Sequence, residues 1–349
     1  MKSEDRKKVI LDTLVKDYID HGEAISSSSL VNKTGLDISS ATIRNTLVSL
    51  EQEGFVKHLH TSSGRVPTDR GYRFYVNNLA TDNLNTESLL YFERSLEDVS
   101  ASIDKMLTYS AQILGLATDY TTIIITENTR NNVLKFIQLV LLNVHQVLLV
   151  IINTYGENFE EIIGVDEKIL DQTILNNITE VLNKLLQGKQ IDDLGNIFEN
   201  NMEDVLKVFG SYEGILGRIY QALSKTNKKI KAGNVVVENA KKLMNFPEFQ
   251  DFSILKNIHS VLEDENKIFK MFQESGVLRR DAVSTCIGSE HKFEELNSSS
   301  LIFSTVNMGG EKIANIGILG PTRMNYEKII SYMKSMAKVL CKKIEQLYT

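Results

Sequence analysis

The sequence predicts an α+β protein with more than one domain, and three observations support this prediction. Residues 39–53 have the periodicity of an amphipathic helix, and a short ribbon rich in arginine follows them. Short aliphatic runs typical of strands occur between residues 121 and 153 and return between residues 235 and 319. The intervening residues 156–231 have mostly helical periodicity. A chain of 349 residues, 42% hydrophobic and 24% charged, is long enough for two or three such domains.

The first 38 residues supply the support for that amphipathic helix. Apolar residues recur at helical spacing from about residue 5 to residue 20. Residues 24–25 predict a very short strand, and the serines at 26–29 offer caps for a helix through residues 30–31. Residues 34–36 then supply a turn that contains glycine. Two helices joined by such a turn, the second reading bases, form the helix-turn-helix arrangement.

The second of these helices has locally encoded ends. Ser39 or Ser40 can cap its first turn, and Gly54 supplies a left-handed residue directly after Glu53. Its inner side is marked by Ile43, Leu47 and Leu50.

Polar side chains occupy the other faces of the same helix. Asn pairs well with adenine, Arg with guanine, and Thr methyl groups contact thymine, so such a face suits a major groove. A polar face is equally typical of a helix that meets only water. We assign base reading to four residues, Ser40, Thr42, Arg44 and Asn45.

The distribution of charge favours contact with DNA. The protein has a net charge of −6, whereas residues 55–76 carry four Lys and Arg against one Asp. We expect this segment to form a two-stranded ribbon, the wing of a winged helix, with its tip at residues 62–65. A basic patch on one module of an acidic protein is typical of phosphate binding. The residues assigned to the wing and its phosphate contacts are Lys57, His60, Ser63, Arg65, Arg70 and Arg73.

Arg70 and Arg73 have a second interpretation. The apolar or aromatic residues Tyr72, Phe74 and Val76 lie between and beyond them. At least one of the two arginines is therefore also a candidate for bracing the wing.

The rest of the chain reads as a linker followed by alternating blocks of helix and strand. Polar residues 79–87 predict the linker, and a long helix is expected at 87–116. A closing helix is expected at about 325–347. A sheet that is interrupted by a helical block and then resumed suggests one domain inserted into another. The expected strands are 121–126, 134–143, 147–153, 235–237, 284–287, 301–306 and 312–319.

Several blocks of this sequence resemble one bacterial family. The longest is His60–Val76, HTSSGRVPTDRGYRFYV, and a second is Ser40–Asn45, SATIRN. Pro247-Glu248-Phe249 and Gly317–Met324, GILGPTRM, agree as well. In all four the chain is similar to the HrcA family of heat-inducible transcription repressors, and the resemblance spans essentially the whole chain.

The resemblance implies names for the predicted parts. Residues 1–80 would be a winged helix-turn-helix DNA-binding domain. Residues 87–155 and 232–349 would form a discontinuous GAF-like α+β domain. Residues 156–231 would be an inserted, mostly helical dimerising domain.

It also implies a function. The expected protein is a cytoplasmic, homodimeric repressor of chaperone genes that binds double-stranded DNA at an inverted-repeat operator. The family further implies that the chaperonin GroEL promotes the active fold, so that heat releases repression by loading the chaperonin with other clients.

Other functions remain as alternatives. One is a repressor that responds to a small-molecule effector in the GAF-like domain, and another is an adaptor whose winged helix binds protein. A hydrolytic enzyme would need a nucleophile and a base, and the sequence offers no such catalytic constellation. We therefore expect no enzyme activity and no cofactor.

Metal and membrane association are not expected either. His58-Leu59-His60 lacks a nearby third ligand, and Cys286 and Cys341 lie outside any metal-binding spacing. The apolar stretch 136–152 is broken by polar residues, and the amino terminus lacks the apolar core of a signal peptide.

Overall fold

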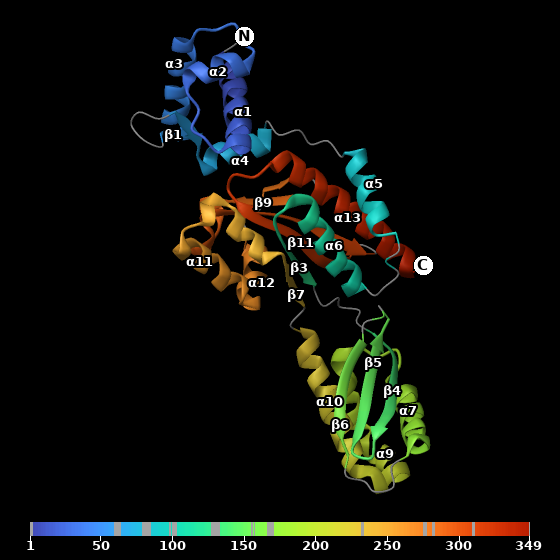
Figure 1. Cartoon of the computed structure of the whole chain (residues 1–349). Coiled ribbons are helices and arrows are strands. Elements are labelled where there is room, and N and C mark those ends of the chain that lie inside the picture. Colours follow the sequence, from blue (N-terminus) through green and yellow to red (C-terminus); the bar gives the residue numbers. More distant parts are fainter. Residues whose placement is uncertain are drawn as a thin grey trace.

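The computed structural model is an α+β protein built from three units (Figure 1). The N-terminal unit and the inserted unit lie at opposite ends, and the unit between them is called the body. The residues that the structure describes are 3–58, 64–78, 85–97, 99, 103–126, 133–154, 156, 158–165, 171–231, 234–274, 278–280, 283–308 and 311–348.

The N-terminal unit is a winged helix-turn-helix. The predicted short strand is confirmed as a bridge between Ile25 and Arg65, and Gly54 has the predicted left-handed backbone with φ of +78°. The elements are α1 (Ser3–His21), α2 (Ser27–Thr34), α3 (Ser40–Gln52), β1 (Val56–His58), β2 (Arg65–Pro67) and α4 (Asp69–Asn78).

Residues 69–78 correct one prediction, because they form helix α4 and not the second half of a ribbon. The Thr68 hydroxyl accepts a hydrogen bond from the Gly71 N–H at 3.1 Å, which caps the first turn. Tyr72, Tyr75 and Val76 are buried at helical spacing. Arg70 and Arg73 therefore lie on a helix beside the wing, outside its strands.

The body is a six-stranded antiparallel sheet with helices on both faces. Its strand order is β7-β3-β11-β10-β9-β8. Ile124 packs with α6 and α13 on one face, while Ile123 and Ile125 pack with α11 and α12 on the other. The strands are β3 (Thr121–Thr126), β7 (Val235–Glu238), β8 (Leu278–Arg280), β9 (Val283–Ile287), β10 (Ser299–Met308) and β11 (Glu311–Pro321).

The helices of the body correct a second prediction. The expected helix at 87–116 is two helices, because α5 packs against α13 whereas α6 packs against β3. The rings of Phe92 and Tyr332 join α5 to α13 with centroids 5.5 Å apart. The helices are α5 (Thr86–Ser95), α6 (Ile103–Thr118), α11 (Phe252–Leu262), α12 (Glu265–Glu274) and α13 (Tyr326–Tyr348), with short 3-10 helices η3 (Ala240–Asn245), η4 (Pro247–Phe249), η5 (Gly288–Glu290) and η6 (Glu294–Leu296).

The inserted unit begins earlier than residue 156, which corrects the expected boundary. In a separate three-stranded sheet, β5 pairs with β4 on one side and with β6 on the other, and this sheet shares a hydrophobic core with the helices that follow. Strand pairing assigns β4 and β5 to the inserted unit, and the sequence of a single strand does not show which strand it pairs with. The elements are β4 (Leu134–Asn143), β5 (Gln146–Asn153), β6 (Asn158–Gly164), α7 (Gln172–Leu186), η1 (Ile191–Asp193), α8 (Leu194–Asn200), α9 (Met202–Phe209), η2 (Gly210–Tyr212) and α10 (Glu213–Lys231).

Candidate nucleic-acid interface

Helix α3 presents one continuous exposed face. Ser39 caps the helix, its hydroxyl accepting from the Thr42 N–H at 3.2 Å, while Ile43, Leu47 and Leu50 are buried against α1 and α2. The exposed side chains follow one another at helical spacing. They are Ser40, Ala41, Arg44, Asn45, Val48 and Gln52.

Three of the four expected base-reading residues lie on this face, and the fourth does not. Arg44 and Asn45 are exposed, and neither side chain bonds to another described residue. Ser40 is exposed as well, and its hydroxyl donates to Ser27 of α2 at 3.3 Å. Thr42 is half-buried, and its hydroxyl lies 3.0 Å from the Ser39 hydroxyl, so it belongs to the cap.

Sequence reasoning missed Ala41 and Val48, which share the exposed face with Arg44 and Asn45. Val48 leaves 40% of its surface exposed. Helical spacing from Arg44 could have found both residues, but an apolar side chain gives no obvious polar signal. Apolar groups at such positions can contact thymine methyl groups in a major groove.

The described part of the wing is a short antiparallel pair extended by one bridge. Lys57 pairs with Val66 and His58 with Arg65, and the Ile25 backbone adds hydrogen bonds to both sides of Arg65. His60 and Ser63, two of the expected wing contacts, lie outside the described residues.

Arg65 is turned toward the recognition helix. Its guanidinium donates to Glu51 of α3 at 2.8 Å and lies 2.6 Å from Nδ1 of His58. The Arg65 side chain is only 12% exposed. This arrangement holds the wing against the last turn of α3. It also means that Arg65, which was expected to contact phosphate, is paired with Glu51.

Two other cations of this region remain on the surface. Lys57 projects from β1 and is exposed. Arg70 is exposed at the start of α4, with its guanidinium 5.0 Å from the centre of the Phe55 ring.

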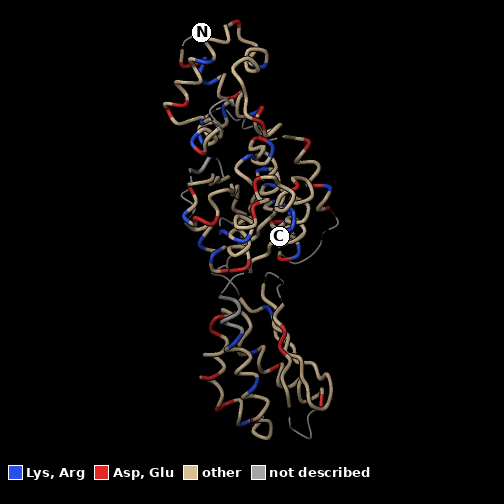
Figure 2. The backbone as a smooth tube through the Cα atoms, turned by 60° about the vertical axis from the view of Figure 1, so that its left-hand side comes forward, with Lys and Arg blue, Asp and Glu red and all other residues tan. Residues whose placement is uncertain are grey.

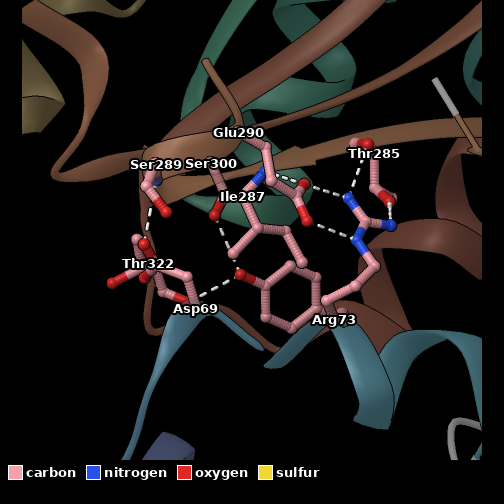
Figure 3. A network of polar contacts seen from close by, with 9 residues as sticks. Asp69, Arg73, Thr285, Ile287, Ser289, Glu290, Ser300 and Thr322 are labelled. Carbon is pink, nitrogen blue, oxygen red and sulfur yellow. Dashed lines mark hydrogen bonds and ion pairs between the residues drawn. The ribbon is translucent and has the colours of Figure 1, made fainter. Parts of the chain in front are cut away.

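Arg73 is bonded to the body (Figure 3). Its guanidinium donates to the hydroxyl and the carbonyl oxygen of Thr285, at 2.6 and 2.8 Å, and forms two hydrogen bonds with the Glu290 carboxylate. Glu290 also accepts from the Ile287 N–H at 2.8 Å. With its side chain only 13% exposed, Arg73 is a docking residue of α4.

Asp69 makes the second contact between α4 and the body. Its carboxylate accepts from the Ser289 N–H at 2.9 Å. Gly288 lies so close that an added Cβ would stand 2.3 Å from the Asp69 carboxylate, so glycine is required there. The docking is also apolar, because the rings of Tyr72 and Tyr326 lie 5.8 Å apart within one continuous core.

Arg323 makes a third contact, at the end of α1. Its guanidinium donates to Glu248 at 2.6 Å and to the Ile19 carbonyl at 2.9 Å. A cation at the carboxyl end of a helix is also favoured by the helix dipole. Arg323 therefore links the turn after β11 to η4 within the body and to α1 of the N-terminal unit.

Charge within the N-terminal unit is less segregated than the sequence indicates. Lys and Arg are interleaved with Asp and Glu along the backbone (Figure 2). Lys7 pairs with Glu53 and Lys33 with Asp17, in addition to the Arg65 pair. The positive charge that is free to meet DNA is therefore concentrated in the few exposed cations.

Metal sites and membrane-spanning helices are both missing from the described part of the chain. Within the described ranges, no group of three or more His, Cys, Asp or Glu side chains is placed to hold a metal ion. No helix among the described residues is long and apolar enough to cross a membrane.

Comparison with known proteins places this architecture among regulators. A family model described as "HrcA protein C terminal domain" matches residues 104–330. A protein of Clostridioides difficile (strain 630) named "Heat-inducible transcription repressor HrcA" is 31% identical over 98% of this chain and 100% of its own length. A protein of the same name from Thermoanaerobacter sp. (strain X514) is 30% identical over 100% of this chain and 99% of its own.

One solved structure shares the fold. It is described as the crystal structure of a hypothetical protein at 2.2 Å resolution, and it superimposes with a TM-score of 0.68 at 20% identity. The match covers 99% of this chain and 98% of that one.

Proposed function

Because this chain belongs to the HrcA family of heat-inducible transcription repressors, we propose that it represses heat-shock genes by binding double-stranded DNA through the exposed face of α3. The observation that carries the proposal is the pairing of Arg44 and Asn45 on that face, with neither side chain engaged by another described residue. The family is one of transcription repressors, so we assign no catalytic residue.

Base reading falls to four side chains of α3. Arg44 and Asn45 supply the bidentate groups that recognise guanine and adenine, and Ser40 supplies a hydroxyl. Val48, one turn further along, adds an apolar contact for a thymine methyl group. Thr42 leaves the set, since its hydroxyl is engaged in the cap.

Phosphate contact falls to the exposed cations Lys57 and Arg70 together with His60 and Ser63 of the wing. Arg65 and Arg73 take a different role. Arg65 holds the wing on α3, and Arg73 holds α4 on the body. Both therefore position the DNA-binding surface without touching DNA.

Homodimerisation is proposed for the open face of the inserted sheet. One face of β4, β5 and β6 packs on helices of the same unit, whereas the other carries apolar side chains in register: Val140 opposite Leu148, and Leu148 opposite Ile162. Ile162 is 59% exposed and Val140 37%. A second copy of the chain presents the same face, which is the self-complementary surface a two-fold dimer needs.

A two-fold dimer matches an inverted repeat, because each winged helix then meets an identical half-site. We propose such an operator for this protein, with action in the cytoplasm. Release of repression on heating, through competition for the chaperonin GroEL, is proposed from the family alone.

In vitro selection from random duplexes tests this function. The purified full-length chain should enrich duplexes in which one short sequence recurs as an inverted repeat. Enrichment of unrelated sequences, or of none, would favour the adaptor alternative, in which the winged helix binds protein.

A further inference from the structure

A small polar cavity lies where the N-terminal unit meets the body. Its volume is about 270 Å³, and it is lined on one side by α1, the wing and α4, and on the other by η4 and the turn that follows β11. Pockets that hold small molecules begin at roughly 300 Å³, so this cavity suits a compact occupant. The polar lining residues that matter here are Tyr18, Lys57, Asp69, Tyr72, Glu248 and Arg323.

Two buried polar atoms on this lining lack a hydrogen-bond partner within the described part of the chain. They are the Tyr72 hydroxyl oxygen and Oε2 of Glu248. Tyr72 is only 3% exposed, and burial raises its pKa well above the ordinary value, so the hydroxyl stays protonated. Buried polar groups are normally hydrogen-bonded, and an unpaired one is costly.

The neighbours of these atoms are already engaged. Oε1 of Glu248 accepts from Arg323, and Asp69 accepts from the Ser289 N–H. The Thr68 hydroxyl, also on the lining, donates to the Gly54 carbonyl at 2.6 Å. The open positions on this lining include the Tyr72 hydroxyl, Oε2 of Glu248 and the exposed ammonium group of Lys57.

The charges of the lining decide what kind of molecule fits. Lys57 and Arg323 are cations, and Asp69 and Glu248 are anions, so the lining is balanced. A phosphate or another multiply charged anion would face two carboxylates at short range, which disfavours it. An apolar ligand would leave Tyr72 and Glu248 unpaired. The best match is a molecule that is neutral overall and carries a donor at one end and an acceptor at the other.

We propose that this cavity binds a small zwitterion of the amino-acid class. Its ammonium group donates to Oε2 of Glu248, while its carboxylate accepts from the Tyr72 hydroxyl and faces Lys57 at the rim. Because the walls come from both units, the occupant bridges the winged helix and the body. The site lies outside the interior of the body and away from the exposed face of α3, and it shares Lys57 with the proposed phosphate contacts.

Thermal unfolding and calorimetric titration of the full-length chain test the proposal, with each standard L-amino acid as the probe. At least one should bind saturably and raise Tm by a few degrees at about one hundred times its Kd. Glycine betaine, a zwitterion without an N–H donor, should not. Absence of any saturable binding would overturn the proposal, because solvent alone would then meet these groups.

The decisive variant is Tyr72→Phe, which keeps the ring and removes only the hydroxyl. It should weaken binding of the amino acid by about tenfold to one hundredfold. Tyr91→Phe, at an exposed tyrosine of α5, is the matched control and should bind as the wild type does. Equal affinities in Tyr72→Phe and the control would place the amino acid elsewhere and contradict the site. Neither readout involves DNA, so failure here is separate from failure of the proposed function.

Discussion

The Arg73 guanidinium in α4 is bonded to the hydroxyl and carbonyl oxygen of Thr285, a residue 212 positions later in the chain. Because of this contact, α4 is held by the body as well as by the N-terminal unit. The sequence left two roles open for Arg70 and Arg73, contact with phosphate and support of the wing. The structure gives Arg73 a supporting role.

Arg73→Ala should destabilise the protein and leave its DNA affinity nearly unchanged. Removing the arginine leaves the Glu290 carboxylate with one partner fewer in a partly buried site, which costs about 3 kcal/mol in the free energy of unfolding. Denaturant unfolding measures this cost, and Arg70→Ala, at an exposed arginine, is the control and should change stability by less than about 0.5 kcal/mol.

The same variants distinguish the two roles in binding. Measured well below Tm, Arg73→Ala should keep the wild-type salt dependence of operator binding, whereas Arg70→Ala should lower the slope by about one. A lower slope for Arg73→Ala would assign that arginine to phosphate after all.

Asn45→Ala should cost specificity. The loss of a bidentate contact to a base is expected to weaken operator binding by about 1–3 kcal/mol and to leave binding to a random duplex almost unaltered. Fluorescence anisotropy on both duplexes measures the two losses. Equal losses would mean that Asn45 contacts the backbone or supports the fold.

Val48 should read a thymine methyl group. Replacing one thymine in each half-site by uracil removes that methyl, so the wild type should lose about 1 kcal/mol at one position of a thymine-to-uracil scan. The affinity of Val48→Ala should not change with that replacement. The protein substitution and the base replacement together form a double-mutant cycle. A scan in which the wild type and the variant respond alike at every thymine would remove Val48 from the interface.

Local signals in the sequence were enough to predict the recognition helix. The Ser39 cap and the left-handed Gly54 bound α3 as expected, because both depend on neighbouring residues alone. Five of the six strands of the body were also predicted closely, since each contains a short aliphatic run. The sixth, β8, was not predicted, because its sequence Leu278-Arg279-Arg280 has no such run.

The incorrect predictions concern elements whose structure depends on residues far away in the sequence. Residues 69–78 form a helix docked on the body, and the partners of Arg73 lie more than two hundred residues away. Strands β4 and β5 look alike in sequence whichever sheet they join. Strand β6, which pairs with β5, was missed because residues 156–231 have mostly helical periodicity. At the site, Val48 was missed because an exposed apolar residue looks like a core residue until the helix is oriented.

His291 should make stability depend on pH. Burial lowers the pKa of His291 from 6.5 to about 4, so the unfolded chain binds a proton more readily than the folded one. The stability that depends on neutral His291 is fully present above pH 6.5 and is lost as the pH falls toward 4. This loss lowers the free energy of unfolding by roughly 3 kcal/mol. His291→Gln should show a shallower loss between those pH values in denaturant unfolding. Parallel curves for the two proteins would contradict this assignment.

Val140→Lys should weaken the proposed dimer. A lysine on the open face of β4 would place a charge opposite Leu148, within the apolar contact proposed between the two copies. Sedimentation should show a shift toward monomer, and Lys135→Ala, at an exposed residue of the same strand, should not change the mass. A Val140→Lys protein that sediments as the wild type does would place the dimer contact elsewhere.

The proposed function depends on sequence-specific binding by α3, which a comparison of two duplexes measures. The measurement compares the affinity of the full-length chain for its selected inverted repeat with that for a scrambled duplex, between about 50 and 200 mM salt. We expect an affinity ratio on the order of 10³ or more that falls sharply in Asn45→Ala. Equal affinities for the two duplexes at every salt concentration would contradict it.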